Sequence, residues 1–89
     1  MTEARLAKVL SDGMVQLAYR ASERDELDLA LWTTVKVRQP HTCKVTGDPI
    51  PVGTKAFAPV GNQMYRGHRI SAALMEKAIV GWRQEQESQ

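Results

Sequence analysis

The chain has 89 residues, a hydrophobic share of 43% and a formal net charge of +2. This length fits one small domain over residues 1–89 with a modest core, and the hydrophobic share is too high for a disordered chain. A single cysteine excludes an intramolecular disulfide framework, and no stretch reaches the roughly 18 apolar residues of a membrane span. The sequence therefore favours a cytoplasmic protein with no membrane partner.

The N-terminal segment has the spacing of a short helix over Thr2–Leu10. Thr2 can cap such a helix, and Leu6, Val9 and Leu10 recur at helical intervals to form an apolar stripe. We therefore expect the chain to begin with a short helix whose apolar side packs on the rest of the domain.

The next twenty residues are ambiguous between strand and helix. Over residues 14–20, apolar Val15, Leu17 and Tyr19 alternate with other residues, which favours a strand. A helix that runs through to residue 33 is the alternative. A separate helix over residues 22–31 is also plausible, because Ser22 begins a capping-box pattern with acidic residues in the first turn.

The middle of the chain is rich in strand-forming residues. Residues 32–38 predict a strand that Pro40 ends. Residues 54–60 and 63–70 predict a hairpin around Gly61-Asn62, which suits a two-residue turn with glycine first. In that register Phe57 lies opposite Arg66 and Lys55 lies opposite His68. Pro59 further predicts that the first hairpin strand is an edge strand.

The C-terminal segment predicts a helix from Ala72 to about Gln84, capped by Ser71. One side of it carries Met75, Ile79 and Trp82 and should pack on the sheet. The predicted fold is therefore α+β: a small antiparallel sheet or hairpin with a short N-terminal helix and a C-terminal helix packed on it.

Charge is unevenly distributed along the chain. Residues 36–69 hold six basic groups against one acidic group, Asp48, whereas both flanks are mildly acidic. Such asymmetry can mark a surface for anionic partners. The predicted anion-binding or nucleic-acid-binding residues are Arg38, Lys44, Lys55, Arg66, His68 and Arg69. Solvated side chains without a partner are the alternative explanation for each of them.

Residues 41–57 contain one further motif, Cys-x-x-Thr-Gly-x-x-Ile-x-x-Gly from Cys43 to Gly53. A structural zinc site commonly takes two ligands from a Cys-x-x-Cys turn, but Thr46 stands at the second position and a neutral hydroxyl is a poor zinc ligand. His41, Cys43 and His68 are the available donors, one short of four. We therefore expect no cofactor, and Cys43 as a buried thiol in a proline-stiffened turn.

The segment over residues 38–70 resembles a degenerate treble-clef or zinc-ribbon knuckle, as found in small phage and bacterial proteins. Cys43, Gly47, Ile50 and Gly53 agree with that pattern, whereas Thr46 departs from it. The resemblance implies a knuckle followed by a hairpin, and a phage or bacterial origin. It does not carry metal binding over to this chain.

No catalytic constellation stands out, because Cys43 and the two histidines have no positioned third group. We therefore expect a small non-enzymatic binding or regulatory protein that engages nucleic acid or an acidic protein surface through a basic hairpin. The alternative is a protein–protein interaction or inhibitor module with apolar anchors at Trp32, Phe57, Met64 or Tyr65. A homodimer through an edge strand and a zinc-dependent structural module are further alternatives.

Overall fold

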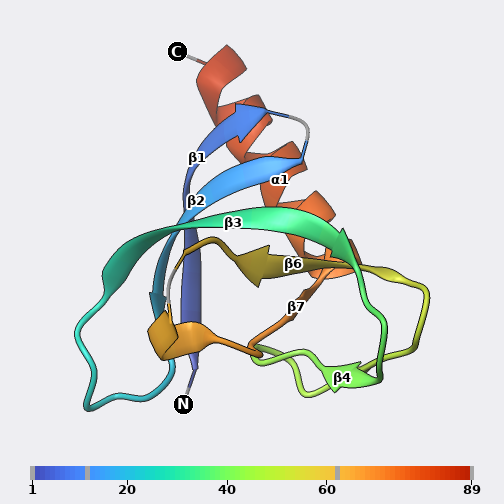
Figure 1. Cartoon of the computed structure of the whole chain (residues 1–89). Coiled ribbons are helices and arrows are strands. Elements are labelled where there is room, and N and C mark those ends of the chain that lie inside the picture. Colours follow the sequence, from blue (N-terminus) through green and yellow to red (C-terminus); the bar gives the residue numbers. More distant parts are fainter. Residues whose placement is uncertain (1, 12, 62, 89) are drawn as a thin grey trace.

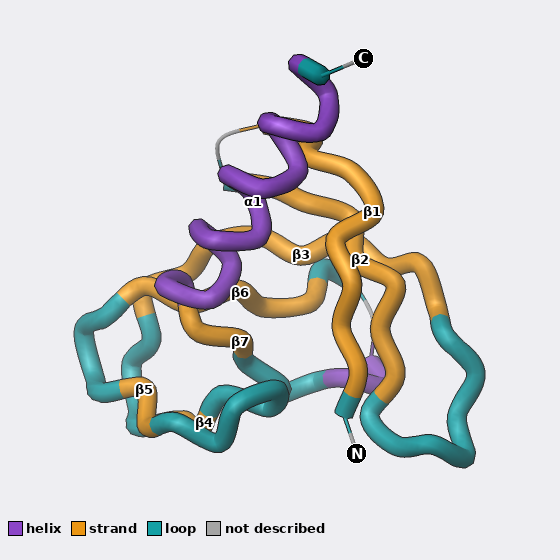
Figure 2. Tube along the Cα trace, turned by 180° about the vertical axis from the view of Figure 1, so that it is seen from behind, coloured by secondary structure: helices purple, strands orange, loops and turns teal. Residues whose placement is uncertain are grey.

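The computed structural model describes residues 2–11, 13–61 and 63–88. Its elements are β1 (Glu3–Ser11), β2 (Met14–Arg20), β3 (Asp28–Lys36), β4 (His41–Thr42), β5 (Pro49–Ile50), β6 (Lys55–Pro59), the 3-10 turn η1 (Gln63–Tyr65), β7 (Ile70–Ser71) and α1 (Ala72–Glu87). Five strands form one antiparallel sheet in the order β1-β2-β3-β6-β7, and β4 pairs with β5 in a separate small hairpin. The sheet curls, and α1 runs along one of its faces (Figures 1 and 2).

The core lies between the sheet and α1. In β2, the alternating residues Val15, Leu17 and Tyr19 are buried, as the period of two predicts, and Val15 lies opposite the buried Trp32 of β3. Met75 of α1 closes the core from the helix side. The strand prediction for residues 14–20 is therefore confirmed, and a helix through residue 33 is wrong.

The predicted N-terminal helix is wrong, because residues 3–11 form strand β1. The sheet register explains the misleading pattern. Leu6 lies opposite Leu17 and Val9 lies opposite Val15, with a register shift between Leu6 and Lys8. This β-bulge adds one residue between two inward-facing side chains, so a strand shows the three-residue spacing that is typical of a helix. The predicted fold, a small antiparallel sheet or hairpin with a short N-terminal helix and a C-terminal helix packed on it, is therefore replaced by a larger curled sheet with one C-terminal helix in the described residues.

The predicted hairpin is also wrong in its second half. Residues 63–65 form the turn η1, and β7 is limited to Ile70–Ser71. Phe57 therefore lies opposite Ile70 and not opposite Arg66. The physical reason is Tyr65, which is 1% exposed and would point away from the core in a regular strand continuation. Gly61 belongs to the described chain, but Asn62, the other half of the predicted turn, lies outside the described residues.

Strand β6 is an interior strand, so the prediction of an edge strand from Pro59 is wrong. β6 lies between β3 and β7, and β7 reaches only as far as Phe57. Pro59 pairs with Trp32 of β3 and stands beyond the end of β7, where its missing N–H breaks no hydrogen bond. The long sheet edge belongs to β1, whose bulges and charged Lys8 are features that discourage edge-to-edge pairing.

Two other segments can be compared with their predictions. A helix over residues 22–31 is wrong: Ser22 and Asp25 form a turn in which the Asp25 N–H donates to the Ser22 carbonyl, and β3 starts at Asp28. The C-terminal helix is confirmed, with Ser71 as its cap. The Ser71 hydroxyl accepts a hydrogen bond from the Leu74 N–H at 3.2 Å.

The packing of Ile70 predicts a large loss of stability on truncation. Ile70 is fully buried and joins β7 to the core, so Ile70→Ala should lower the free energy of unfolding by about 2–5 kcal/mol. Val80→Ala is the matched control, because Val80 is 55% exposed on α1 and its truncation should cost about 0.5 kcal/mol or less. Urea unfolding measures both, and equal effects would contradict this account of the core.

Candidate functional site

Arg69 lies at the junction between the sheet and the Cys43 turn. It forms an isolated parallel bridge with Cys43, and its carbonyl accepts the Lys44 N–H at 3.0 Å. One guanidinium nitrogen, Nη1, donates to the His68 carbonyl at 2.8 Å. The Nε–H is buried without a hydrogen-bond partner. Hydrogen bonds and the bridge to Cys43 therefore fix the backbone of Arg69.

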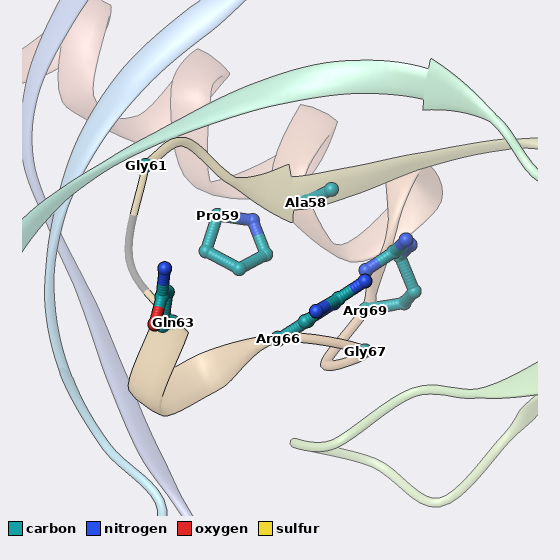
Figure 3. A pocket seen from close by; sticks show the side chains of 7 residues that line it. All are labelled: Ala58, Pro59, Gly61, Gln63, Arg66, Gly67 and Arg69. Atoms are coloured by element: carbon teal, nitrogen blue, oxygen red, sulfur yellow. The ribbon is translucent and has the colours of Figure 1, made fainter.

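Two surface cavities share Arg69. The first, of about 350 Å³, we call the Arg66 cavity; it is lined by Ala58, Pro59, Gly61, Gln63, Arg66, Gly67 and Arg69. Figure 3 shows Pro59 between Gln63 on one side and the two arginines on the other. Gly67 has a φ of 87°, a left-handed backbone that favours glycine and turns the chain between Arg66 and Arg69.

The second cavity, the Arg38 cavity, has a volume of about 310 Å³. It is lined by Val35, Lys36, Val37, Arg38, Gln39, His41 and Arg69. Its cations come from the end of β3, from the segment before β4 and from Arg69. Arg69 therefore connects two hollows whose other basic residues are more than twenty-five positions apart in the sequence.

The structure groups some of the predicted site residues and separates others. Arg38, Arg66 and Arg69 line the two joined cavities, and Lys44 is hydrogen-bonded through its backbone to Arg69. Lys55 lines neither cavity but lies directly opposite Lys36 in the β3–β6 register. We call Lys36, Arg38, Lys44, Arg66 and Arg69 the basic surface.

The side chain of His68 points away from this surface and into the core, where its Nδ1 lies 2.9 Å from the Tyr19 hydroxyl. His68 therefore packs against Tyr19 and is not placed to bind a ligand on the basic surface, although the charges of Lys44 and Arg69 act on it. Lys36, Gln39, His41 and Gln63 line the cavities but were not among the predicted anion-binding residues. The spacing of Lys36 two residues before Arg38 could have indicated that both side chains share a strand face.

Carboxylates do not neutralise the basic surface within the part of the chain that the structure describes. The ion pairs there join Glu3 to Arg5 at 3.2 Å and Glu3 to Arg20 at 2.6 Å, both at the N-terminal end of the sheet. Acidic residues gather instead in the loop over residues 22–28, which lies on the other side of the molecule from the β4–β5 hairpin (Figures 1 and 2). This loop nevertheless reaches the turn that precedes Arg66, because the Asp28 carboxylate accepts a hydrogen bond from the Tyr65 hydroxyl.

The Cys43 turn holds its sulfur with hydrogen bonds. The thiol is 1% exposed, and its Sγ accepts the Ser71 N–H at 3.4 Å. The Gly47 N–H donates to the Cys43 carbonyl at 2.8 Å, which closes the turn. Burial raises the pKa of Cys43, but the Thr46 hydroxyl and the backbone N–H groups of Ser71, Thr46 and Val45 outweigh it and lower the pKa of the thiol below its usual value.

The three metal-ligand candidates do not converge. Within residues 2–11, 13–61 and 63–88, no group of three or more His, Cys, Asp or Glu side chains could hold a metal ion. His41 lines the Arg38 cavity, Cys43 is enclosed by its own turn, and His68 bonds to Tyr19. The resemblance to a zinc-ribbon knuckle stays a prediction about shape.

Both histidines have depressed basicity. Burial lowers the pKa of His68 below its usual value of 6.5, and the charges of Lys44 and Arg69 lower it further. Burial and Arg69 also lower the pKa of His41. Burial, followed by Tyr65, raises the pKa of Tyr19 to about 12. The phenol therefore keeps its proton at neutral pH and can donate it to a neutral His68 ring.

No family model, curated protein or solved structure matches the chain. Among the described residues, no helix combines the length and the apolar content that a membrane crossing requires. The predicted compartment and origin stay predictions.

Replacing Thr46 should change the acidity of the neighbouring thiol. Thr46→Val removes a hydroxyl that stabilises the Cys43 thiolate, so the pKa of Cys43 should rise. The ultraviolet absorbance of the thiolate, followed against pH, measures this shift, with Cys43→Ser as the baseline. Thr42→Val, an exposed change in β4, is the control. An unchanged titration in Thr46→Val would show that the hydroxyl does not support the sulfur.

The depressed histidines predict a loss of stability on acidification. Because the pKa of His68 is lower in the folded protein than in the unfolded chain, the unfolded chain binds more protons below 6.5. The free energy of unfolding should therefore fall as pH drops through 6.5 toward the folded pKa. His68→Gln should make this decline shallower, leaving the His41 contribution. Urea unfolding from about pH 7.5 to about pH 5.5 measures it, and an unchanged slope in the variant would contradict the assignment.

Proposed function

We propose that the protein is a non-enzymatic binding protein that holds the phosphate backbone of nucleic acid on its basic surface. The observation that carries the proposal is the position of Arg69, which lines two cationic cavities at once. Guanidinium groups donate in a planar fork that matches phosphate oxygens, so charge-assisted hydrogen bonds can form there. The Arg66 side of the surface and the Arg38 side can then contact one continuous anionic polymer.

The arrangement of like charges supports an anionic partner. Lys36 and Lys55 face each other across β3 and β6, and like charges directly opposite in a sheet destabilise it. Arg38 and Arg69 share one cavity without a described carboxylate between them. A bound polyanion removes this repulsion, so binding gains from charges that cost stability in the free protein.

The acidic loop gives the proposed complex an orientation. Glu23 and Glu26 are exposed in the loop over residues 22–28, away from the β4–β5 hairpin (Figure 1). Their charges repel a polyanion and disfavour its extension from the basic surface onto this loop. An extended contact over the whole molecule is therefore disfavoured.

A protein partner is the second candidate, and the exposed leucines favour it. Leu29 and Leu31 lie two residues apart on one face of β3, and Leu29 is 65% exposed. Three of the four apolar anchors predicted from the sequence, Trp32, Phe57 and Tyr65, are buried and cannot serve as contacts in this fold. This candidate, including self-association through β1, predicts binding that depends weakly on salt.

Neutralising one arginine on each side of the surface tests the proposed function. Arg38 and Arg66 are both exposed, so Arg38→Gln with Arg66→Gln should leave the fold intact. For the native protein, log Kd should change with log salt by a slope of about four to five, and the double variant should lose about two from this slope. Fluorescence anisotropy of a labelled nucleic acid at two salt concentrations measures both.

The matched control is Lys8→Gln with Lys77→Gln, which removes the same charge from exposed positions in β1 and α1 outside the two cavities. Its slope should equal that of the native protein. Equal losses in the two double variants would show that net charge alone drives binding. If the affinity does not change with salt, or if no binding is detected, the proposed nucleic-acid function is wrong.

A further inference from the structure

The Phe, Tyr and Trp side chains of this chain lie outside the two cavities of the basic surface. All five fall within the described residues, and neither cavity lining includes one of them. Tyr19, Trp32 and Tyr65 form a buried cluster, with ring centroids 4.9 Å apart for Tyr19 and Trp32 and 4.8 Å apart for Tyr19 and Tyr65. Phe57 is also buried, and Trp82 lies partly buried on α1. The two cavities therefore present guanidinium and ammonium groups, the His41 imidazole and aliphatic side chains, but no Phe, Tyr or Trp ring.

This placement bears on the kind of nucleic acid that the surface can hold. Proteins that bind single strands combine a basic groove with aromatic rings on which bases stack, and each stacked base contributes on the order of tenfold in affinity. The two cavities offer no Phe, Tyr or Trp ring for such stacking, and the imidazole among their lining residues is that of His41 in the Arg38 cavity. The affinity of the basic surface then depends on the density of phosphate charge, which is higher in a duplex, with one charge per about 1.7 Å of helix axis.

The apolar residues of the two cavity linings also disfavour the stacking of single-stranded bases. Apart from polar residues and glycines, the Arg66 cavity is lined by Ala58 and Pro59, and the Arg38 cavity by Val35 and Val37. These short side chains cannot cover the face of an unstacked base, and in a duplex the bases are already stacked on each other. The charged groups of the two linings can contact phosphates without any base being turned outward.

We propose that the basic surface binds the phosphate backbone of double-stranded nucleic acid in preference to a single strand. This inference rests on the proposed function and specifies its ligand. Arg69 contacts the backbone from the centre of the surface, with Arg66 and Arg38 on either side of it. A duplex presents a rigid, dense row of phosphates to these cations, whereas a flexible single strand must be ordered before it makes the same contacts.

The test compares ligands of one sequence in different forms. A labelled mixed-sequence oligonucleotide is titrated as a single strand, as a DNA duplex and as the corresponding RNA duplex, using fluorescence anisotropy at two salt concentrations. We expect at least one duplex to bind several-fold more tightly than the single strand. For about five contacted phosphates, the salt slope should be near 4.5 for the duplex and near 3.5 for the single strand.

A gain of stacking provides the second arm. Gln39 is exposed and lines the Arg38 cavity, so Gln39→Trp places an aromatic ring beside the cations without disturbing the core. This variant should raise the affinity for the single strand more than for the duplex and narrow the difference between them. Gln39→Leu, which adds apolar surface but no ring, is the control and should leave the difference unchanged.

The outcomes separate the two proposals. Single-strand binding as tight as duplex binding by the native protein overturns the duplex preference while the nucleic-acid function stands. The same conclusion follows if Gln39→Trp and Gln39→Leu have equal effects on both ligands. Absence of binding to all three oligonucleotides removes the nucleic-acid function itself, and the preference with it.

Discussion

The burial of Tyr65 is the constraint on which the arrangement of the surface depends. Its ring packs edge-on against Tyr19, and its hydroxyl donates to the Asp28 carboxylate at 3.0 Å. Burial, together with that hydrogen bond and charge, raises the pKa of Tyr65, so the phenol keeps its proton. Because this anchor fixes the turn η1, the chain leaves it with Arg66 outward and His68 inward against Tyr19. The contact of Tyr65 with the core thus positions the cations of the Arg66 cavity, and contacts between the cations do not.

A second set of contacts ties the Cys43 turn to the same region. The sulfur accepts a backbone N–H from Ser71, which also caps α1, and the neighbouring Lys44 N–H donates to Arg69. A zinc ion in a knuckle does comparable work by linking a turn to a hairpin. Here the hydroxyl of Thr46 and several backbone N–H groups stabilise the sulfur, so a threonine at this position is consistent with a turn held by hydrogen bonds. This junction brings the β4–β5 hairpin, with its adjacent Arg38 and His41, against Arg69.

The sequence predicts the parts of this fold that local pattern determines, and fails where a distant contact decides. Alternation identifies β2, and Ser71 identifies the start of α1, because both signals come from neighbouring residues. The bulge in β1 produces a helical spacing that only the partner strand can reveal. Likewise, residues 63–70 have the sequence pattern of a strand, and only the contact between Tyr65 and Tyr19 in the folded chain explains why residues 63–65 form a turn. For the site, six residues followed from pooled charge, but the joining of Arg38 to Arg66 through Arg69 depends on tertiary structure.

The pKa values of the two histidines respond to cations of the basic surface. Burial is the main cause of their lowered basicity, and the next causes are the cations Lys44 and Arg69 for His68 and Arg69 for His41. A positive potential that resists a proton attracts an anion by the same Coulomb interaction. An anion bound at Arg69 would weaken that potential and raise the pKa of both rings, so anion binding and proton binding favour each other through linkage. The proposed ligand would therefore remove the part of this acid sensitivity that comes from Lys44 and Arg69 and leave the larger part that comes from burial.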